Sequence, residues 1–159
     1  MSSQVLEERI NVSSVGLSNS SVYESLLPNV KNSLAYKQKE FIHGLDDFEA
    51  PYLQEKLLKD GKFSSPEEYQ QAFNEFKKYV TLDKLIGTSP LGMASTKVDE
   101  VWHQFILFTK EYAKFCDGML GYFFHHSPYT SQTPKDKRKE GSKNFMISYR
   151  QIFGEIPSI

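Results

Sequence analysis

The stretch S-P-E-E-Y-Q-Q-A-F-N-E-F-K-K-Y-V-T-L-D-K-L-I, residues 65–86, carries the most complete helix signal in the chain. Ser65 can cap a helix, Pro66 suits the first helical position, and Glu68 supplies the acid of a capping box. Large apolar residues then recur at spacings of 4, 3 and 4, which places them on one helical face. These residues are Tyr69, Phe73, Phe76 and Val80. The stretch therefore predicts a long amphipathic helix that ends near residue 86.

Two helices are predicted before this stretch. Apolar residues between positions 29 and 45 recur at spacings of 4, 7 and 4, which suits one face of a helix. The segment 48–62 reads F-E-A-P-Y-L-Q-E-K-L-L-K-D-G-K. Pro51 falls in what would be the first turn of a helix, and Gly61 falls just past its end. We therefore expect one helix in each of these segments.

Helical patterns continue after the central stretch. A loop rich in Gly, Pro and Ser, residues 87–95, precedes a segment that predicts one helix over 97–117, with Gly118 as its C-terminal cap. A further loop over 127–137 is followed by a last predicted helix over 138–153. No segment shows a convincing alternation of apolar and polar residues with the period of 2 that indicates a strand.

These patterns together predict an all-α fold. A chain of 159 residues suits one domain. We expect a single compact domain of four to five helices over residues 22–159. Residues 1–21 are rich in Ser and Asn and poor in large apolar groups, which predicts a flexible N-terminal arm.

Composition excludes several classes of protein. Nineteen basic and twenty acidic residues give a net charge of −1, whereas nucleic-acid binders usually carry a basic surplus, so nucleic acid is not an expected partner. No run approaches the roughly 18 apolar residues of a membrane-spanning helix, so no membrane association is expected. The N-terminus lacks the apolar stretch of a secretory signal, and the single cysteine cannot form an internal disulfide. A cytoplasmic location follows as an expectation, and homo-oligomer formation stays open.

The residues with distinctive chemistry gather in one segment, 96–128, which reads T-K-V-D-E-V-W-H-Q-F-I-L-F-T-K-E-Y-A-K-F-C-D-G-M-L-G-Y-F-F-H-H-S-P. Asp99 and His103 are one helical turn apart, and a Gly-containing turn can bring His125 and His126 back toward them. Carboxylate and imidazole together suit zinc, iron or manganese. These four residues therefore predict a metal site. In the alternative, Asp99 only orients His103 by a hydrogen bond and the histidine pair packs at a helix end.

Cys116 is a second candidate for chemistry. A thiol activated by a nearby histidine, with Asp99 as the orienting group, would form a nucleophile. Cys116 falls on the packed face of the predicted helix, which favours the alternative of a small core residue.

Aromatic residues make up 14% of the chain, and several in this segment are candidates for contact with a protein partner. On the predicted helix, Phe108 and Phe115 fall away from the packed face. They either meet another helix or form an exposed contact surface. The full set of predicted contact residues is Trp102, Phe108, Tyr112, Phe115 and Tyr122.

The segment also resembles a motif of small bacterial proteins and of plant glycine-rich domain-containing proteins, D-x-x-W-H-x-H-I-L-x-T-x-x-Y-x-x-x-C followed by G-x-F-x-H-H-x-P. The matching residues are Asp99, Trp102, His103, Ile106, Leu107, Thr109, Tyr112, Cys116, Gly121, Phe123, His125, His126 and Pro128. The resemblance implies a helical domain without an established reaction, in which the polar motif residues form a site. Phe105 stands where the family pattern has a second histidine.

Three hypotheses for function follow. The first is a small helical binding or accessory protein that acts through protein–protein contacts, with a structural or ligand-binding Asp/His cluster. The second is a divalent-metal protein or a metalloenzyme of hydrolase or oxygenase type that uses Asp99, His103, His125 and His126. The third is an enzyme based on Cys116. No complete catalytic set is visible, which favours a role without catalysis. The cofactors to consider are zinc, iron and manganese, because they suit carboxylate and imidazole ligands.

Overall fold

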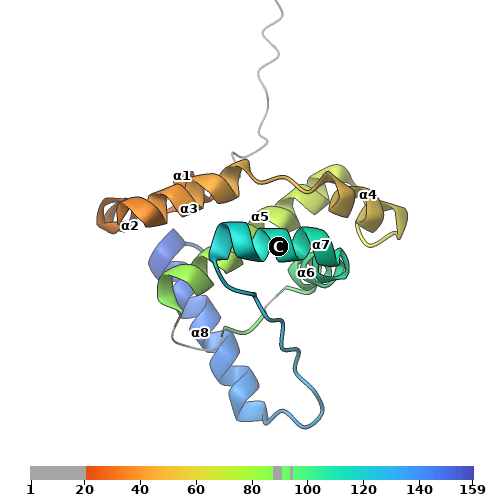
Figure 1. Cartoon of the computed structure of the whole chain (residues 1–159). Helices are drawn as coiled ribbons and strands as arrows, with labels where there is room; N and C mark the ends of the chain where they lie inside the picture. Colours follow the sequence, from red (N-terminus) through yellow and green to blue (C-terminus); the bar gives the residue numbers. More distant parts are fainter. Residues whose placement is uncertain (1–20, 88–90, 94) are drawn as a thin grey trace, which may run out of the picture.

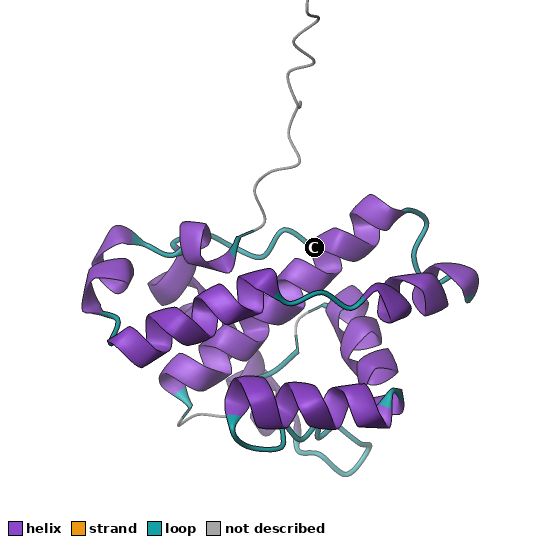
Figure 2. Ribbon diagram, turned by 45° about the horizontal axis from the view of Figure 1, so that its top comes forward, coloured by secondary structure: helices purple, strands orange, loops and turns teal. Residues whose placement is uncertain are grey.

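The computed structural model describes residues 21–87, 91–93 and 95–159. Within these ranges the chain forms helices and loops and contains no strand, as Figure 2 shows. The predicted all-α class is therefore confirmed. The predicted flexible arm lies outside the described residues, apart from Ser21. None of the described helices is long and apolar enough to cross a membrane.

Eight α-helices and one π-helix follow one another in the described part of the chain, more than the four to five expected. The first five are α1 (Val22–Ser25), α2 (Pro28–Ser33), α3 (Tyr36–Asp47), α4 (Pro51–Lys59) and α5 (Pro66–Ile86). The others are α6 (Thr96–Leu107), α7 (Thr109–Phe115), the π-helix η1 (Cys116–Leu120) and α8 (Lys135–Phe153). The expected count was too low because two predicted helices are each divided into shorter pieces and because the short helix α1 was not predicted.

The central helix α5 organises the fold. Its predicted start and end are confirmed: the Ser65 hydroxyl accepts a hydrogen bond from the Glu68 backbone at 3.1 Å, and Gly87 ends the helix with φ 53°. In Figure 1, α1 to α3 lie at one end of the molecule and α4 at the other, with α5 running between them. Helix α5 contacts α1, α3, α4, α6 and α8, so its apolar residues form the middle of the core.

The helix predicted after Pro28 is divided at Leu34 and Ala35. Leu34 has an extended backbone with ψ 133°. The side chain of Gln38 accepts the Ala35 backbone N–H at 2.8 Å, which satisfies a donor that a new helix start would otherwise leave unpaired. The division therefore produces two helices, α2 and α3, where the apolar spacing predicted one.

The helix predicted over 97–117 is also wrong as a single element. Phe108, with φ −81° and ψ 68°, separates α6 from α7, and the π-helix η1 follows. Gly118 lies inside η1, and Gly121, with φ 76°, is the residue that ends it. A glycine tolerates this left-handed conformation without a steric penalty.

The break at Phe108 decides where two aromatic side chains lie. It changes the direction of the chain, so a single helical wheel no longer describes α7. The Phe108 ring packs 5.0 Å from the ring of Tyr52, and Phe115 is buried with its ring 4.9 Å from that of Phe48. Of the two alternatives for Phe108 and Phe115, contact with other helical segments is therefore the correct one.

Phe105 lies at the centre of an aromatic core. Its side chain is fully buried. Five rings surround it with centroids 5.0–6.4 Å away, a separation typical of favourable aromatic pairs. These rings belong to Phe48, Tyr52, Phe76, Tyr112 and Phe115. The high aromatic content of the chain is thus largely core volume.

Replacing Phe105 should show how much the aromatic core contributes to the free energy of unfolding. We expect Phe105→Ala to lower the free energy of unfolding by about 3–5 kcal/mol, because it removes a buried ring and leaves a cavity. The control is Leu107→Ala, two residues along the same helix, where the side chain is 72% exposed. Urea denaturation followed by circular dichroism measures both, and a similar loss in the two variants would contradict the prediction.

Buried tyrosines should make the fold sensitive to alkaline pH. Burial raises the pKa of Tyr69, Tyr79, Tyr112 and Tyr149 above the ordinary value of about 10. The folded state therefore holds these protons more tightly than the unfolded state. We expect stability to be full below pH 10 and to fall as the pH rises beyond it. Tyrosinate absorbance and circular dichroism should change together, and complete ionisation with an intact helical signal would contradict this.

Candidate functional site

Helix α6 carries two of the predicted site residues on one face. The Ser95 hydroxyl accepts the Val98 backbone N–H at 3.3 Å and so starts the helix close to its expected position. Asp99 and His103 follow at a spacing of four residues, which brings the Asp99 Oδ2 atom within 3.4 Å of the His103 Nε2 atom. The carboxylate is partly exposed and the imidazole about half exposed.

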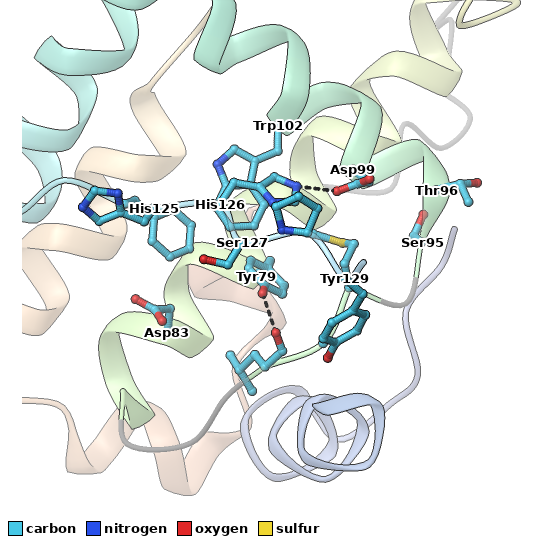
Figure 3. Close-up of a pocket in the computed structure, with 15 residues that line it drawn as sticks. Tyr79, Asp83, Ser95, Thr96, Asp99, Trp102, His125, His126, Ser127 and Tyr129 are labelled. Carbon is cyan, nitrogen blue, oxygen red and sulfur yellow. Dashed lines mark hydrogen bonds and ion pairs between the residues drawn. The ribbon is translucent and has the colours of Figure 1, made fainter. Parts of the chain in front are cut away.

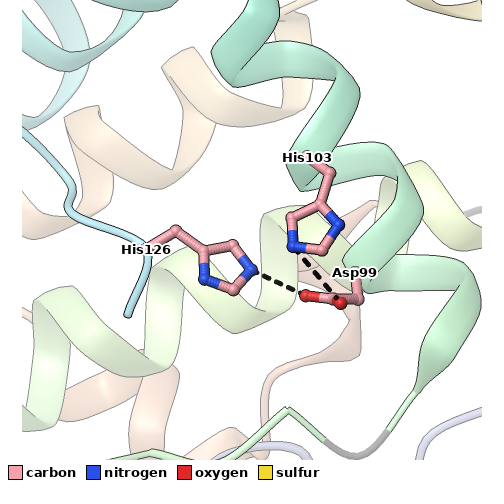
Figure 4. A group of neighbouring side chains, drawn as sticks. All are labelled: Asp99, His103 and His126. Carbon is pink, nitrogen blue, oxygen red and sulfur yellow. Dashed lines mark hydrogen bonds and ion pairs between the residues drawn. The ribbon is translucent and has the colours of Figure 1, made fainter. Parts of the chain in front are cut away.

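The third site residue comes from the segment that follows η1. His126 lies opposite α6, with its Nε2 atom 2.7 Å from Asp99 Oδ1. Its ring stacks on that of His103 with the centroids 4.5 Å apart. Figure 4 shows the carboxylate reaching both imidazoles. One ligand atom from each of Asp99, His103 and His126 lies within 4.8 Å of the other two. We call these three residues the Asp/His triad.

His125, the fourth predicted ligand, lies apart from the triad. Its ring packs 4.8 Å from that of Phe123, and its side chain is exposed. In Figure 3 it lies on the far side of His126 from Asp99. The backbone that brings His126 to Asp99 leaves the His125 ring against Phe123 instead. The expectation that His125 joins the ligand set is therefore not met.

A buried hydrogen-bond network holds the segment that presents His126. Trp102 donates its indole N–H to the Tyr112 hydroxyl at 3.0 Å, and that hydroxyl donates to the Phe124 carbonyl. The Trp102 ring lies 4.6 Å from the ring of Phe124 and 4.3 Å from that of His126. We call Trp102, Tyr112 and Phe124 the support network. It fixes the backbone two residues before His126.

This network changes the interpretation of the predicted contact residues. Trp102, Tyr112 and Phe115 are buried, so they do not offer a surface to a protein partner. Phe108 is half-buried. Tyr122 is 40% exposed, and its hydroxyl donates to Asp83 Oδ2 at 2.8 Å. The sequence indicated these aromatics as a group but could not separate supporting residues from surface residues.

Cys116 also belongs to the buried support of the site. Its side chain is buried, and its sulfur accepts the Phe124 backbone N–H at 3.5 Å. Within the described part of the chain, the interactions of Cys116 and those of His103, His125 and His126 do not join the thiol to an imidazole. The arrangement of a thiol beside a histidine base, on which the nucleophile hypothesis depends, is therefore not formed here.

Two members of the triad line a cleft of about 540 Å³. Asp99 and His126 form part of its wall, as Figure 3 shows. The opposite parts come from α5, from the residues before α6 and from the segment after His126. They include Tyr79, Asp83, Met93, Ser127 and Tyr129. The sequence gives no sign of this role for Tyr79, Asp83 and Tyr129, because no local pattern connects α5 with residues almost fifty positions later.

The donor set of the triad has a defined chemistry. Two imidazole nitrogens and one carboxylate oxygen from two chain segments are ligands that suit divalent transition metals. Three protein ligands leave positions for water or a substrate. The same contacts also suit a carboxylate that orients two histidines without an ion.

Removing one hydroxyl should test the support network. We expect Tyr112→Phe to lower the free energy of unfolding by about 1–3 kcal/mol, because the Trp102 N–H and the Phe124 carbonyl lose a buried partner while the ring remains. Tyr36→Phe is the control, since Tyr36 is 80% exposed; a change within about 0.5 kcal/mol is expected there. Equal stability of the two variants in urea denaturation would contradict the role of the network.

Comparison with known proteins places the chain in a family. The family described as UCP032817-like matches residues 37–150, a range that extends from α3 into α8 and includes the triad and the support network. Comparisons with curated proteins and with solved structures gave no match. Because the family match covers more than half of the chain, this protein belongs to the UCP032817-like family.

Proposed function

We propose that this protein binds one divalent transition-metal ion, zinc, iron or manganese, at Asp99, His103 and His126. The observation that carries the proposal is the convergence of their three ligand atoms within 4.8 Å, from two segments of chain, at the wall of a cleft. If Asp99 only oriented one histidine by a hydrogen bond, the structure would require neither a second imidazole nor a cleft beside the pair.

The spacing of the ligand atoms supports this function. Two protein ligands about 2.1 Å from a common ion, at tetrahedral or octahedral angles, lie about 3.0–3.4 Å from each other. The Asp99 oxygens lie 2.7 Å and 3.4 Å from the two imidazole nitrogens. These distances involve different oxygens of Asp99, and the three ligand atoms lie within 4.8 Å of one another. An ion shared by all three therefore requires the side chains to adjust.

The surroundings of His126 also support a metal ligand. Side chains that bind metals usually have their orientation set by packing and hydrogen bonds in the layer around them. The Trp102 ring lies against the His126 ring, and the support network holds the backbone at Phe124. These contacts orient the imidazole before an ion arrives, which lowers the cost of assembling the site.

The cleft suggests what a bound ion would do. With three protein ligands, the ion keeps a position for water or a substrate oxygen, which is typical of catalytic metals. We therefore propose a metalloprotein of hydrolase or oxygenase type over a purely structural metal site. The motif resemblance to glycine-rich domain-containing proteins supports a site at the same residues, although Phe105 replaces the second histidine of that pattern. Phe105 lies in the core, so the triad does not need a histidine there.

A binding or accessory role in the cytoplasm is the second candidate. It rests on the exposed aromatic and aliphatic side chains near the site, with Phe123 51% and Leu107 72% exposed. Three of the five aromatics first assigned to such contacts are buried. This hypothesis therefore has less support than metal binding.

Metal titration tests the proposed site. We expect the untagged protein, stripped with a chelator, to bind one equivalent of Zn²⁺ or Co²⁺ by calorimetry, with the Co²⁺ absorption typical of nitrogen and oxygen ligands. Loss of a residue that only hydrogen-bonds to a metal ligand weakens metal binding roughly 10- to 100-fold. We expect at least this weakening from each substitution of a ligand: Asp99→Asn, His103→Ala and His126→Ala.

His125→Ala is the matched control, because it removes the neighbouring imidazole, which lies outside the triad. It should leave the affinity unchanged, and circular dichroism checks that all four variants fold. Binding that is absent, or that His126→Ala leaves intact, would contradict the proposal.

A further inference from the structure

We propose that the cleft beside the triad binds a small organic cation with a primary ammonium group, and that Asp83 is the residue that recognises it. This inference goes beyond metal binding and does not depend on it, since Asp83 is not a member of the triad. It rests on the charge, the hydrogen bonds and the side-chain composition of the cleft.

The formal charges on the cleft wall are negative. Asp83 and Asp99 are its two carboxylates, and no lysine or arginine is among the described residues that line it. In Figure 3 the two carboxylates lie on different sides of the cleft. A phosphate or carboxylate ligand would therefore meet like charge without a lysine or arginine to compensate it, whereas an ammonium group would meet opposite charge.

Asp83 has acceptor capacity left for a ligand. An ionised carboxylate offers about four lone-pair sites. Within the described part of the chain, the side-chain hydrogen bond of Asp83 comes from the Tyr122 hydroxyl to Oδ2, and no described lysine or arginine forms an ion pair with it. By contrast, the two oxygens of Asp99 face His103 and His126. Asp83 is thus the carboxylate free to accept from a cation.

Two cationic side chains close to residues of the cleft wall have other partners. Lys84, next to Asp83 in the chain, donates to the Leu120 carbonyl at 3.0 Å and lies over the Tyr122 ring. Arg138 lies over the Tyr129 ring and donates to the Thr130 carbonyl. Neither side chain forms an ion pair with Asp83.

The rest of the wall suits an ammonium group. Aromatic rings of Tyr79, Trp102 and Phe124 line the cleft, and aromatic rings attract cations. The Ser127 hydroxyl also lines it and can accept one of the three N–H bonds of an ammonium. The volume of about 540 Å³ falls within the range typical of small-molecule sites.

The environment of Tyr79 supports a negative field in the cleft. Burial raises the pKa of the Tyr79 hydroxyl, and the charges of Asp83, Tyr129 and Asp99 raise it further. Burial disfavours any charged group, but the part of this shift that comes from Asp83 and Asp99 has the sign that favours a cationic guest.

Titration of the metal-free protein with putrescine tests the proposal, with chemical shifts of backbone amides as the readout. We expect saturable shifts at cleft residues. The uncharged 1,4-butanediol and the dianion succinate, which match its length, should produce none. Asp83→Asn should weaken putrescine binding roughly 10- to 100-fold, the effect of losing a hydrogen bond between charged groups.

Asp117→Asn is the matched control, since it removes the same charge from an exposed position on η1, outside the cleft. It should leave putrescine binding unchanged. Nα-acetyl-lysine methylamide distinguishes the source of the ammonium: tighter binding of this probe identifies a lysine side chain of a polypeptide, and tighter binding of putrescine a free amine.

Several outcomes would overturn the proposal. These are preferential binding of succinate, equal weakening by the two substitutions, and no binding of any amine. Because the titration is done without metal, it separates this proposal from metal binding. A protein that fails to bind Zn²⁺ can still bind putrescine through Asp83, and the reverse also holds.

Discussion

The Tyr112 hydroxyl connects parts of the chain that no helix joins. It accepts from Trp102 on α6 and donates to the Phe124 carbonyl in the segment after η1. Because these groups are buried, each would carry a substantial desolvation cost without its partner. The hydroxyl thereby sets the distance between α6 and the segment after η1. That distance brings His126 to Asp99, and the opening of the cleft beside them depends on it as well.

The break at Phe108 and the π-helix η1 make this connection geometrically feasible. An unbroken helix over 97–117 would carry Tyr112 and Cys116 away along its axis. Instead, Phe108 changes the chain direction, and Gly121 ends η1 in a left-handed conformation. The chain then passes back along α6, and Cys116 accepts the Phe124 backbone N–H on the way. No Pro or Gly explains the break at Phe108, and the packing of Phe108 against Tyr52 and of Phe115 against Phe48 supplies its physical reason.

Site and core share residues in this protein. The Trp102 ring packs against Phe76 and Tyr79 of α5 on one side and against His126 on the other. Trp102 therefore connects the core directly to the triad. The cleft receives its second carboxylate from α5, through Asp83, so the central helix that organises the fold also shapes the electrostatics of the site.

The sequence by itself determined the helical class, the full extent of α5 and the segment that holds the site. These follow from local signals: the cap at Ser65, the apolar spacing after it, and rare residue types at close spacing around Asp99 and His103. The sequence could not show where α6 ends, because no local signal opposes the helix at Phe108. It also could not choose between His125 and His126, since that depends on which of the two side chains the folded backbone directs toward α6. Both the position of His126 and the placement of Asp83 and Tyr79 beside the triad depend on tertiary packing. Packing decides them because they arise from contacts between residues far apart in the chain.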